Sequence, residues 1–192
     1  MADENALLPR PFSYFGFKDE IAEFLIKIRG KFTRRLAGMR EGERILWRGP
    51  YGRPLPKMDE PVLIAGGVGA APLRFYKALY GGKLVLGLPS HYPELVKLVN
   101  PDVLATEDGS AGVKGTVLEA LPEGDIAIAC GPEPMLRALT ELWPEDKLIL
   151  VLEGMMACGV GICLGCAVRR RGGGYYRLCK DGPWFWANQI EL

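Results

Sequence analysis

The sequence predicts an α/β fold with additional β structure, and three observations support this prediction. Short apolar runs alternate with helix-forming stretches between residues 58 and 152. A segment rich in turn residues precedes that region, and a segment of glycines and cysteines follows it. Alternation of strands and helices is typical of a parallel sheet with helices packed on its faces. We therefore expect three domains, at residues 1–57, 58–152 and 153–192.

Composition and charge exclude several classes of protein. With 48% hydrophobic and 24% charged residues, the chain has the composition of a globular protein. Its net charge of +1 gives no reason to expect binding to nucleic acid or to an anionic membrane. The first residues are acidic, no apolar stretch follows them, and no run is long enough for a membrane span. We expect a cytoplasmic protein, in which clustered cysteines bind metal or do redox work more often than they form disulfides.

The first domain is predicted to be β-rich. Residues 23–29 alternate in part between apolar and polar side chains, and residues 45–48 have the composition of a strand. Residues 49–52, Gly-Pro-Tyr-Gly, form a turn signal, and Pro54 and Pro56 follow it. These prolines are predicted to begin a short link to the second domain.

The second domain is predicted to contain a parallel sheet. Its candidate strands are short, apolar and bounded by Gly, Pro or Asp, as in strands buried on both faces. They span residues 61–65, 83–88, 102–106, 125–129 and 147–152. The candidate helices between them span residues 70–80, 92–99, 117–121 and 134–142.

A glycine-rich turn joins the first strand of this sheet to its helix. The turn comprises Gly66, Gly67, Val68 and Gly69, and Pro72 suits the first helical turn, where its missing N–H costs nothing. Free N–H groups at a helix start favour a pyrophosphate, although many such turns are plain connections. The turn also departs from G-x-G-x-x-G, because Pro72 occupies the third glycine position.

A second loop is predicted at the same edge of the sheet. Cys130, Gly131 and Pro132 follow a predicted strand, at the end where open α/β sheets bind ligands. Taken alone, Cys130 is better interpreted as a small buried hydrophobic residue.

Four cysteines near the C-terminus give the strongest signal in the chain. Cys158, Cys163 and Cys166 have the spacing C-x4-C-x2-C, and Cys179 follows after twelve residues. This is the plant-type spacing for a [2Fe–2S] cluster, whose loop needs glycine between its ligands. Cys179 lies at the end of a predicted hairpin, with strands at 167–171 and 175–179 around three glycines. A zinc site, which usually shows two short-spaced cysteine pairs, and unligated buried cysteines are the alternatives.

Taken together, these motifs resemble the ferredoxin-reductase superfamily. The shared segments are Gly-Gly-Val-Gly-Ala-Ala-Pro-Leu from Gly66, Cys-Gly-Pro-Glu-Pro-Met from Cys130, and the cysteine loop with residues 177–183. Within the superfamily, residues 10–185 are similar to electron-transfer subunits of NAD-dependent (class 1B) dihydroorotate dehydrogenases, as is the segment at residues 106–115. The resemblance implies a partial N-terminal FAD-binding β-barrel, a parallel α/β NAD-binding domain and a small C-terminal [2Fe–2S] domain.

The resemblance also implies residues that contact FAD. The Arg-Pro-x-Ser motif of the family, which contacts the flavin, corresponds to Arg10, Pro11, Phe12 and Ser13. A strand that lines the flavin corresponds to Leu25, Ile26 and Lys27. A Gly-Thr pair that binds the pyrophosphate corresponds to Phe32 and Thr33, so either the bulky Phe32 side chain turns away or the pyrophosphate is placed differently.

The N-terminal segment is shorter than the family pattern. About half of the family's six-stranded barrel precedes Arg-Pro-x-Ser, whereas nine residues precede Arg10 here. We expect either translation from an upstream start or a partial barrel whose open strand edges a partner covers.

The function implied is electron transfer from NADH through FAD and the cluster to the FMN of a separate dihydroorotate dehydrogenase catalytic subunit, in a heterotetramer. The sequence shows no group of residues that would act as a catalytic acid, base or nucleophile, and His91 is expected at the surface. The choice between NADH and NADPH stays open, because the strand ending at residue 88 is followed by neither an acidic residue nor an arginine. The alternatives are a small subunit of a sulfide dehydrogenase, hydrogenase or transhydrogenase, and a zinc-stabilised nucleotide-binding module.

Overall fold

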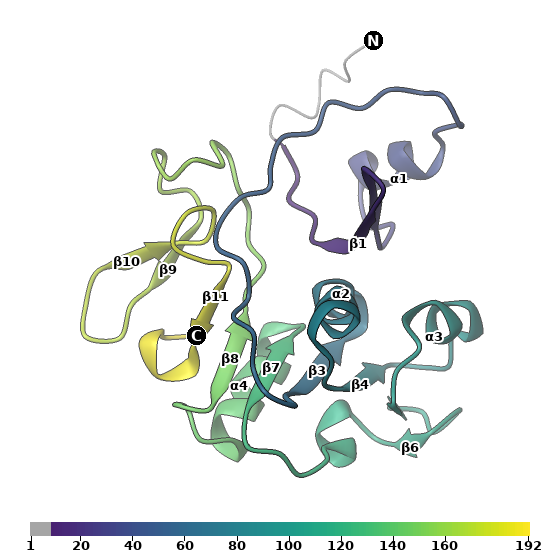
Figure 1. The fold of residues 1–192 in the computed structure, drawn as a ribbon, viewed down its shortest axis with the longest axis vertical. Coiled ribbons are helices and arrows are strands. Elements are labelled where there is room, and N and C mark those ends of the chain that lie inside the picture. The colour runs from purple at the N-terminus through teal and green to yellow at the C-terminus, as the bar shows by residue number, and fades with distance from the viewer. Residues whose placement is uncertain (1–8) are drawn as a thin grey trace.

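The computed structural model describes residues 9–192 and is built around one seven-stranded sheet (Figure 1). The strands lie in the order β11-β8-β7-β3-β4-β5-β6. All neighbours pair in parallel except β11, which runs antiparallel to β8 at one edge. Their bounds are β3 Val62–Gly66, β4 Lys83–Leu88, β5 Val103–Thr106, β6 Val113–Lys114, β7 Ala127–Cys130, β8 Leu148–Val151 and β11 Trp184–Trp186.

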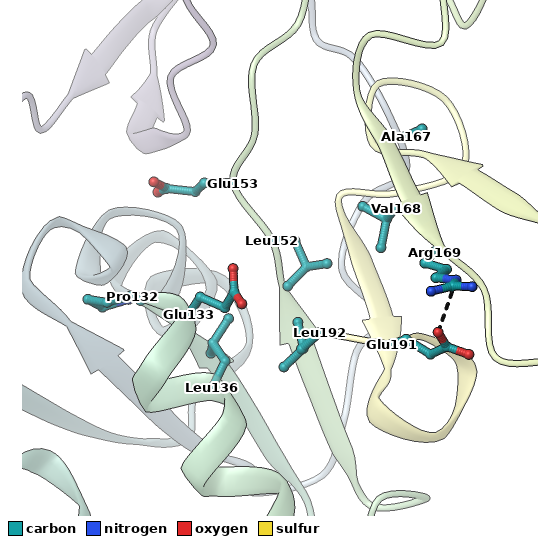
Figure 2. A pocket seen from close by; sticks show the side chains of 11 residues that line it. Pro132, Glu133, Leu136, Leu152, Glu153, Ala167, Val168, Arg169, Glu191 and Leu192 are labelled. Atoms are coloured by element: carbon teal, nitrogen blue, oxygen red, sulfur yellow. Dashed lines mark ion pairs between the residues drawn. The ribbon is translucent and has the colours of Figure 1, made fainter.

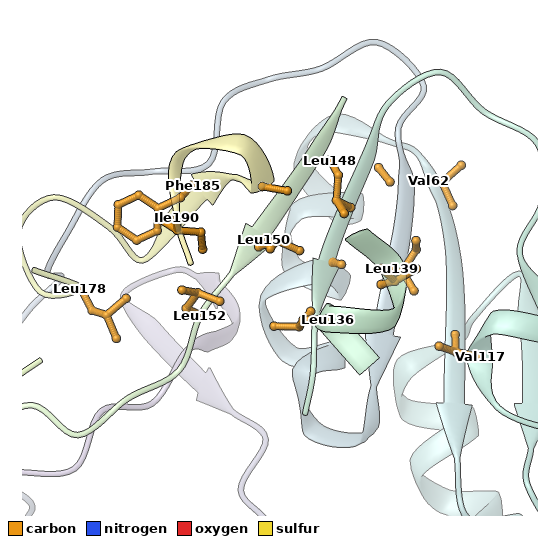
Figure 3. Close-up of a cluster of buried hydrophobic side chains, with 14 of the residues drawn as sticks. Val62, Val117, Leu136, Leu139, Leu148, Leu150, Leu152, Leu178, Phe185 and Ile190 are labelled. Atoms are coloured by element: carbon orange, nitrogen blue, oxygen red, sulfur yellow. The ribbon is translucent and has the colours of Figure 1, made fainter. Parts of the chain in front are cut away.

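The sheet is covered on both faces, which explains why its central strands are apolar over most of their length. Helix α2 (Ala70–Tyr80) and helix α3 (Pro93–Val99) cover one face. Helix α4 (Glu133–Leu142) and the 3₁₀ turn η2 (Val117–Ala120) cover the other (Figure 3). Strand side chains alternate between these two cores, so that Leu63 faces α2 and Ile64 faces α4.

The N-terminal part contains a β-hairpin beside α2. Strands β1 (Tyr14–Lys18) and β2 (Ile21–Phe24) pair with each other in antiparallel fashion and with no other strand of the described chain. Phe15 is buried in the α2-side core, and the Arg74 guanidinium lies 4.6 Å from the centre of its ring. The short helix α1 (Lys31–Ala37) follows. Residues 1–8 of the predicted first domain lie outside the described residues.

The C-terminal part is attached to the central sheet. Strands β9 (Ala167–Arg169) and β10 (Tyr175–Arg177) form the predicted hairpin, and the chain then returns as β11 to pair with β8. Phe185 of β11 is fully buried and its ring stacks on Tyr176 at 4.9 Å between centroids. The cysteine segment therefore shares the α4-side core with the sheet, and the turn η3 (Ala187–Gln189) follows β11.

Most predicted elements of the second domain are confirmed, and two other predictions are wrong. All five predicted strands and the helices at 70–80, 92–99 and 134–142 are present, with ends shifted by no more than two residues. Residues 45–48 form no strand because no neighbouring strand pairs with them. Residues 117–120 form a 3₁₀ turn rather than an α-helix, since Thr116 caps a segment only four residues long. The alternation at 23–29 continues as a strand only to Phe24.

No helix among residues 9–192 is both long enough and apolar enough to cross a bilayer.

Candidate functional site

The two loops predicted to bind the dinucleotide lie against each other. The glycine turn follows β3 as a 3₁₀ turn, η1 (Gly67–Gly69), and leads directly into α2. A Cβ atom on Gly69 would overlap the carbonyl oxygen of Cys130, and one on Gly66 would lie 2.7 Å from Cδ of Pro132. Glycine is needed at these two positions because any side chain would push the loops apart.

Cys130 forms a neutral, closed wall of this site. Its side chain is fully buried at the end of β7. Burial raises the pKa of the Cys130 thiol far above its ordinary value, and the nearby Glu153 carboxylate adds to the shift. A thiol in this state does not act as a nucleophile near neutral pH, so its contribution is shape.

Sequence reasoning missed Glu153, which follows β8 at the same edge of the sheet. The surrounding protein raises the pKa of its carboxyl group although the side chain stays open to solvent. Glu153 lines a cavity of about 420 Å³, together with the start of α4 and strand β9 (Figure 2). The signal available in the sequence was an acidic residue directly after an apolar strand. An ion pair between Arg169 and Glu191, 3.2 Å long, closes the far side of the cavity.

A second missed group lies at the ends of β4 and β5. The Asp108 carboxylate accepts hydrogen bonds from the Ser110 hydroxyl at 2.6 Å and the Ser110 amide at 2.9 Å. The Ser110 hydroxyl in turn lies 3.4 Å from the Ser90 hydroxyl and accepts from the His91 amide at 2.7 Å. The hydroxyl groups of Ser110 and Ser90 hold the pKa of Asp108 below its ordinary value. An acidic residue therefore stands beside the end of β4, although β4 itself supplies none.

The predicted cluster cysteines lie on one loop and the hairpin beside it. Cys166 and Cys179 are buried, with their sulfur atoms 3.4 Å apart. Cys158 and Cys163 are more exposed, and the Cys163 thiol hydrogen-bonds to Cys158. Gly159 has a φ of +72°, which lets the loop turn between its first two ligands. The four thiols thus come in two pairs.

Backbone amides point at the outer pair. The Cys158 sulfur accepts hydrogen bonds from the Ile162 amide at 3.3 Å and the Cys163 amide at 3.5 Å. These amide bonds, led by that of Cys163, lower the pKa of Cys158 to about 6. Burial raises the pKa of Cys179 to about 11, and the neighbouring Cys166 thiol adds to this.

This donor set fits a binuclear cluster. A [2Fe–2S] cluster takes two thiolates on each iron and accepts N–H bonds at its sulfur ligands. Among the described residues, no set of three or more His, Cys, Asp or Glu side chains is arranged to hold a single metal ion.

The segments predicted to contact FAD lie together beside α2. The Phe12 ring stacks on the Phe32 ring with centroids 6.2 Å apart, which brings the first and last of these segments together. Thr33 lies in the first turn of α1, where its hydroxyl accepts from the Arg29 and Gly30 amides at 2.8 and 3.0 Å. Leu25 directly follows β2 and packs against the α2-side core.

Comparison with known proteins identifies relatives of the whole chain. A family model, the iron-sulfur cluster binding domain of dihydroorotate dehydrogenase B, matches residues 153–191. The electron transfer subunit of dihydroorotate dehydrogenase B (NAD(+)) from Caldanaerobacter subterraneus subsp. tengcongensis is 38% identical, over 97% of this chain and 82% of the relative. The corresponding subunit of Bacillus velezensis is 34% identical, over 97% of this chain and 81% of the relative.

A solved structure has the same fold. It comes from a study of flavin-based electron bifurcation by the NADH-dependent reduced ferredoxin-NADP oxidoreductase. The TM-score is 0.72 at 26% sequence identity, and the match covers 95% of this chain and 80% of that one. Together with the sequence relatives, this shows that the chain belongs to the family of dihydroorotate dehydrogenase B (NAD(+)) electron transfer subunits.

Proposed function

We propose that this chain connects NAD(H) to the FMN of a dihydroorotate dehydrogenase catalytic subunit, in pyrimidine biosynthesis. When bound, FAD exchanges a hydride with the nicotinamide and single electrons with the [2Fe–2S] cluster, which exchanges electrons with the partner's FMN. The path is reversible, and dihydroorotate oxidation with NAD⁺, the cofactor in the relatives' names, runs from FMN toward the nicotinamide. Dihydroorotate itself binds to the partner.

The arrangement of the cysteines carries the proposal. Two thiol pairs, from a glycine-rich loop and the hairpin beside it, suit two irons, and amide donors aimed at Cys158 favour its thiolate form. We infer that Cys158, Cys163, Cys166 and Cys179 hold the cluster. The buried pair would keep one iron inside the protein and the exposed pair would leave the other near the surface.

The remaining residues position the two other cofactors. We infer that the glycine turn at residues 66–69 binds the pyrophosphate of NAD(H) and that residues 130–132 place its nicotinamide. The segments that lie together beside α2 would hold FAD, with Arg10, Ser13 and Thr33 as polar contacts. Because Thr33 already accepts two amide bonds, its hydroxyl hydrogen is what remains to be shared between the Gly30 carbonyl and a phosphate.

The assembly and the location of the protein are further parts of the proposal. We propose a heterotetramer with two catalytic subunits, located in the cytoplasm, where four free cysteines remain reduced and available to iron.

A second candidate function keeps the cofactors and changes the partner. The likeness to the ferredoxin-NADP oxidoreductase structure favours it, because that fold serves a different electron acceptor. Co-purification separates the two: a partner that contains FMN and no further iron–sulfur centre supports dihydroorotate dehydrogenase.

The test of the cluster is metal analysis of protein purified without oxygen. We expect two irons and two acid-labile sulfides per chain, as a [2Fe–2S] cluster requires, and an EPR signal after reduction with dithionite. Cys163→Ser should abolish that signal, whereas Cys130→Ala, at the one cysteine outside the set, should keep it. A colourless preparation that contains zinc would refute the proposal.

A further inference from the structure

The coil that leads from the N-terminal part to β3 makes specific contacts with the cysteine segment. We call residues 51–54 the strap. In Figure 1 this coil runs down beside β11 before it enters β3. Its contacts fall on three places, which are the loop after Cys179, strand β11 and the loop after Cys158.

The first contact fixes the backbone of the strap. The Arg53 amide donates to the Gly182 carbonyl at 2.6 Å, and a Cβ atom on Gly52 would collide with the same carbonyl oxygen. Gly52 also has a φ of +77°, so both the lack of space and the backbone conformation require glycine at this position. The strap is therefore in close backbone contact with the turn three residues beyond a predicted cluster ligand.

The second set of contacts clamps β11. The Arg53 guanidinium lies 4.4 Å from the centre of the Trp184 ring and donates to the Trp184 carbonyl at 3.3 Å. The Trp184 indole N–H donates to the Pro54 carbonyl at 2.8 Å. These reciprocal bonds hold the strap in register with the edge of the central sheet.

The third contact places the Tyr51 ring on the loop at residues 158–166, which we call the cluster loop. A Cβ atom built on Gly159 would lie 2.7 Å from two ring carbons of Tyr51 and 3.1 Å from its hydroxyl. Gly159 stands between Cys158 and the exposed loop tip. A side chain at this position would collide with the ring, so the Tyr51 ring lies directly on the backbone beside the first cysteine.

We propose that Tyr51 is a positioning residue that covers the cluster loop beside Cys158, held there by the clamp between Arg53 and Trp184. The inference rests on the proposed function in that the loop carries a [2Fe–2S] cluster. Its role would be to shield the backbone beside Cys158 from water and to fix the loop relative to the N-terminal part of the chain. Tyr51 comes from the same coil as the aromatic residue Trp47, which packs on Tyr14 of β1.

Water exclusion has a measurable consequence. A cluster with four thiolate ligands is negatively charged, and reduction makes it more so. Water stabilises the more highly charged reduced form, so a cover that excludes water lowers the reduction potential. Removing the ring should therefore raise the potential and speed the loss of iron to a chelator.

The experiment compares three variants of the full chain. Tyr51→Ala removes the ring, Tyr51→Phe keeps it without the hydroxyl, and Tyr175→Ala removes an exposed tyrosine from the hairpin of the same segment. The measurements are the cluster midpoint potential, the rate of iron loss to a chelator, and amide hydrogen exchange at residues 158–163. The exchange measurement is made with and without the cluster, so it reports on the cover even if the chain holds no iron.

We expect Tyr51→Ala alone to raise the potential, lose iron faster and exchange faster at residues 158–163. Tyr51→Phe and Tyr175→Ala should match the unaltered protein in all three. The inference is overturned if Tyr51→Ala matches it too, or if Tyr51→Phe shifts as far as Tyr51→Ala, because the ring would then not be the cover. Failure of the proposed function is a separate result, namely absence of iron from every preparation.

Discussion

At the scale of single residues, the group around Asp108 bears on the choice of nucleotide. In dinucleotide-binding folds an acidic residue about 20 positions after the glycine turn binds the ribose 2′-hydroxyl. Ser90 occupies that position here. The Asp108 carboxylate is linked to it by the Ser110 hydroxyl, which donates to Asp108 and lies 3.4 Å from the Ser90 hydroxyl. The Asp108 carboxylate would accept a bond from a ribose hydroxyl and repel a 2′-phosphate. The Lys114 side chain packs over Gly109, the residue after Asp108.

We therefore predict that Asp108→Asn narrows the preference for NADH over NADPH by about tenfold, since it removes the repelling charge. The measurement is kcat/KM for both nucleotides with an artificial electron acceptor. Glu107→Gln is the matched control, because it neutralises the adjacent carboxylate, which has no hydrogen bond to Ser110. An unchanged ratio in Asp108→Asn would show that the nucleotide is selected elsewhere.

A second prediction at this scale concerns Glu153 and pH. Its pKa is raised in the folded chain, so the folded state holds this proton more tightly than the unfolded state does. The protonated Glu153 side chain therefore stabilises the folded state fully at pH values below the ordinary glutamate pKa. This stabilisation is lost as the pH rises through the raised pKa of the folded chain. Glu153→Gln should be more stable than the unaltered protein at pH 8 and indistinguishable from it near pH 4. Urea unfolding across that range, with Glu123→Gln as a control, measures the difference; a constant offset would contradict it.

At the scale of elements, the strands that the sequence predicts well are those buried on both faces. Runs such as residues 83–88 are apolar after Lys83 and bounded by glycine or proline, so they can be recognised without knowing which strands lie beside them. Strand β11 was missed because it has three residues and exists through its pairing with β8. Residues 45–48 have similar composition and no partner, and so form no strand.

The same distinction separates the parts of the candidate site. The approach of the glycine turn and residues 130–132 follows from a general rule, because parallel strands end at one edge. The position of Asp108 depends on side-chain hydrogen bonds between loops that follow different strands, and no local pattern encodes these. The contact of Tyr51 with Gly159 joins residues far apart in the sequence, so the pattern of apolar residues along the chain cannot predict it either.

Strand β11 supports a prediction of its own. Phe185 is fully buried between the central sheet and the hairpin, so Phe185→Ala should lower the free energy of unfolding by about 3–5 kcal/mol. Because the α4-side core includes Cys166 and Cys179, the loss should also loosen the buried ligand pair. Thermal unfolding followed by circular dichroism and by cluster absorbance should show both signals shifting together. If the cluster absorbance alone shifted, the hairpin would be an independent unit.

At the scale of the whole molecule, the distribution of exposed apolar side chains indicates where a partner binds. Ile162 is 80% exposed and Leu164 60% exposed, and they flank the exposed Cys163. Val160, on the same loop, is also exposed. Exposed apolar side chains around Cys163 favour a protein interface, and electron transfer to a partner requires that the proposed cluster come close to it.

We predict that Ile162→Asp weakens binding of the catalytic subunit by at least about tenfold, because the interface would have to bury an unpaired charge. Transfer from NADH to a small soluble acceptor should persist, since the NAD and FAD segments lie on other loops. Leu79→Asp, a matched change on an exposed leucine at the end of α2, should leave binding unaltered. Calorimetric titration of each variant with the catalytic subunit measures the two binding affinities. If Ile162→Asp bound as tightly as the unaltered chain, the partner would have to receive electrons from another face of the molecule.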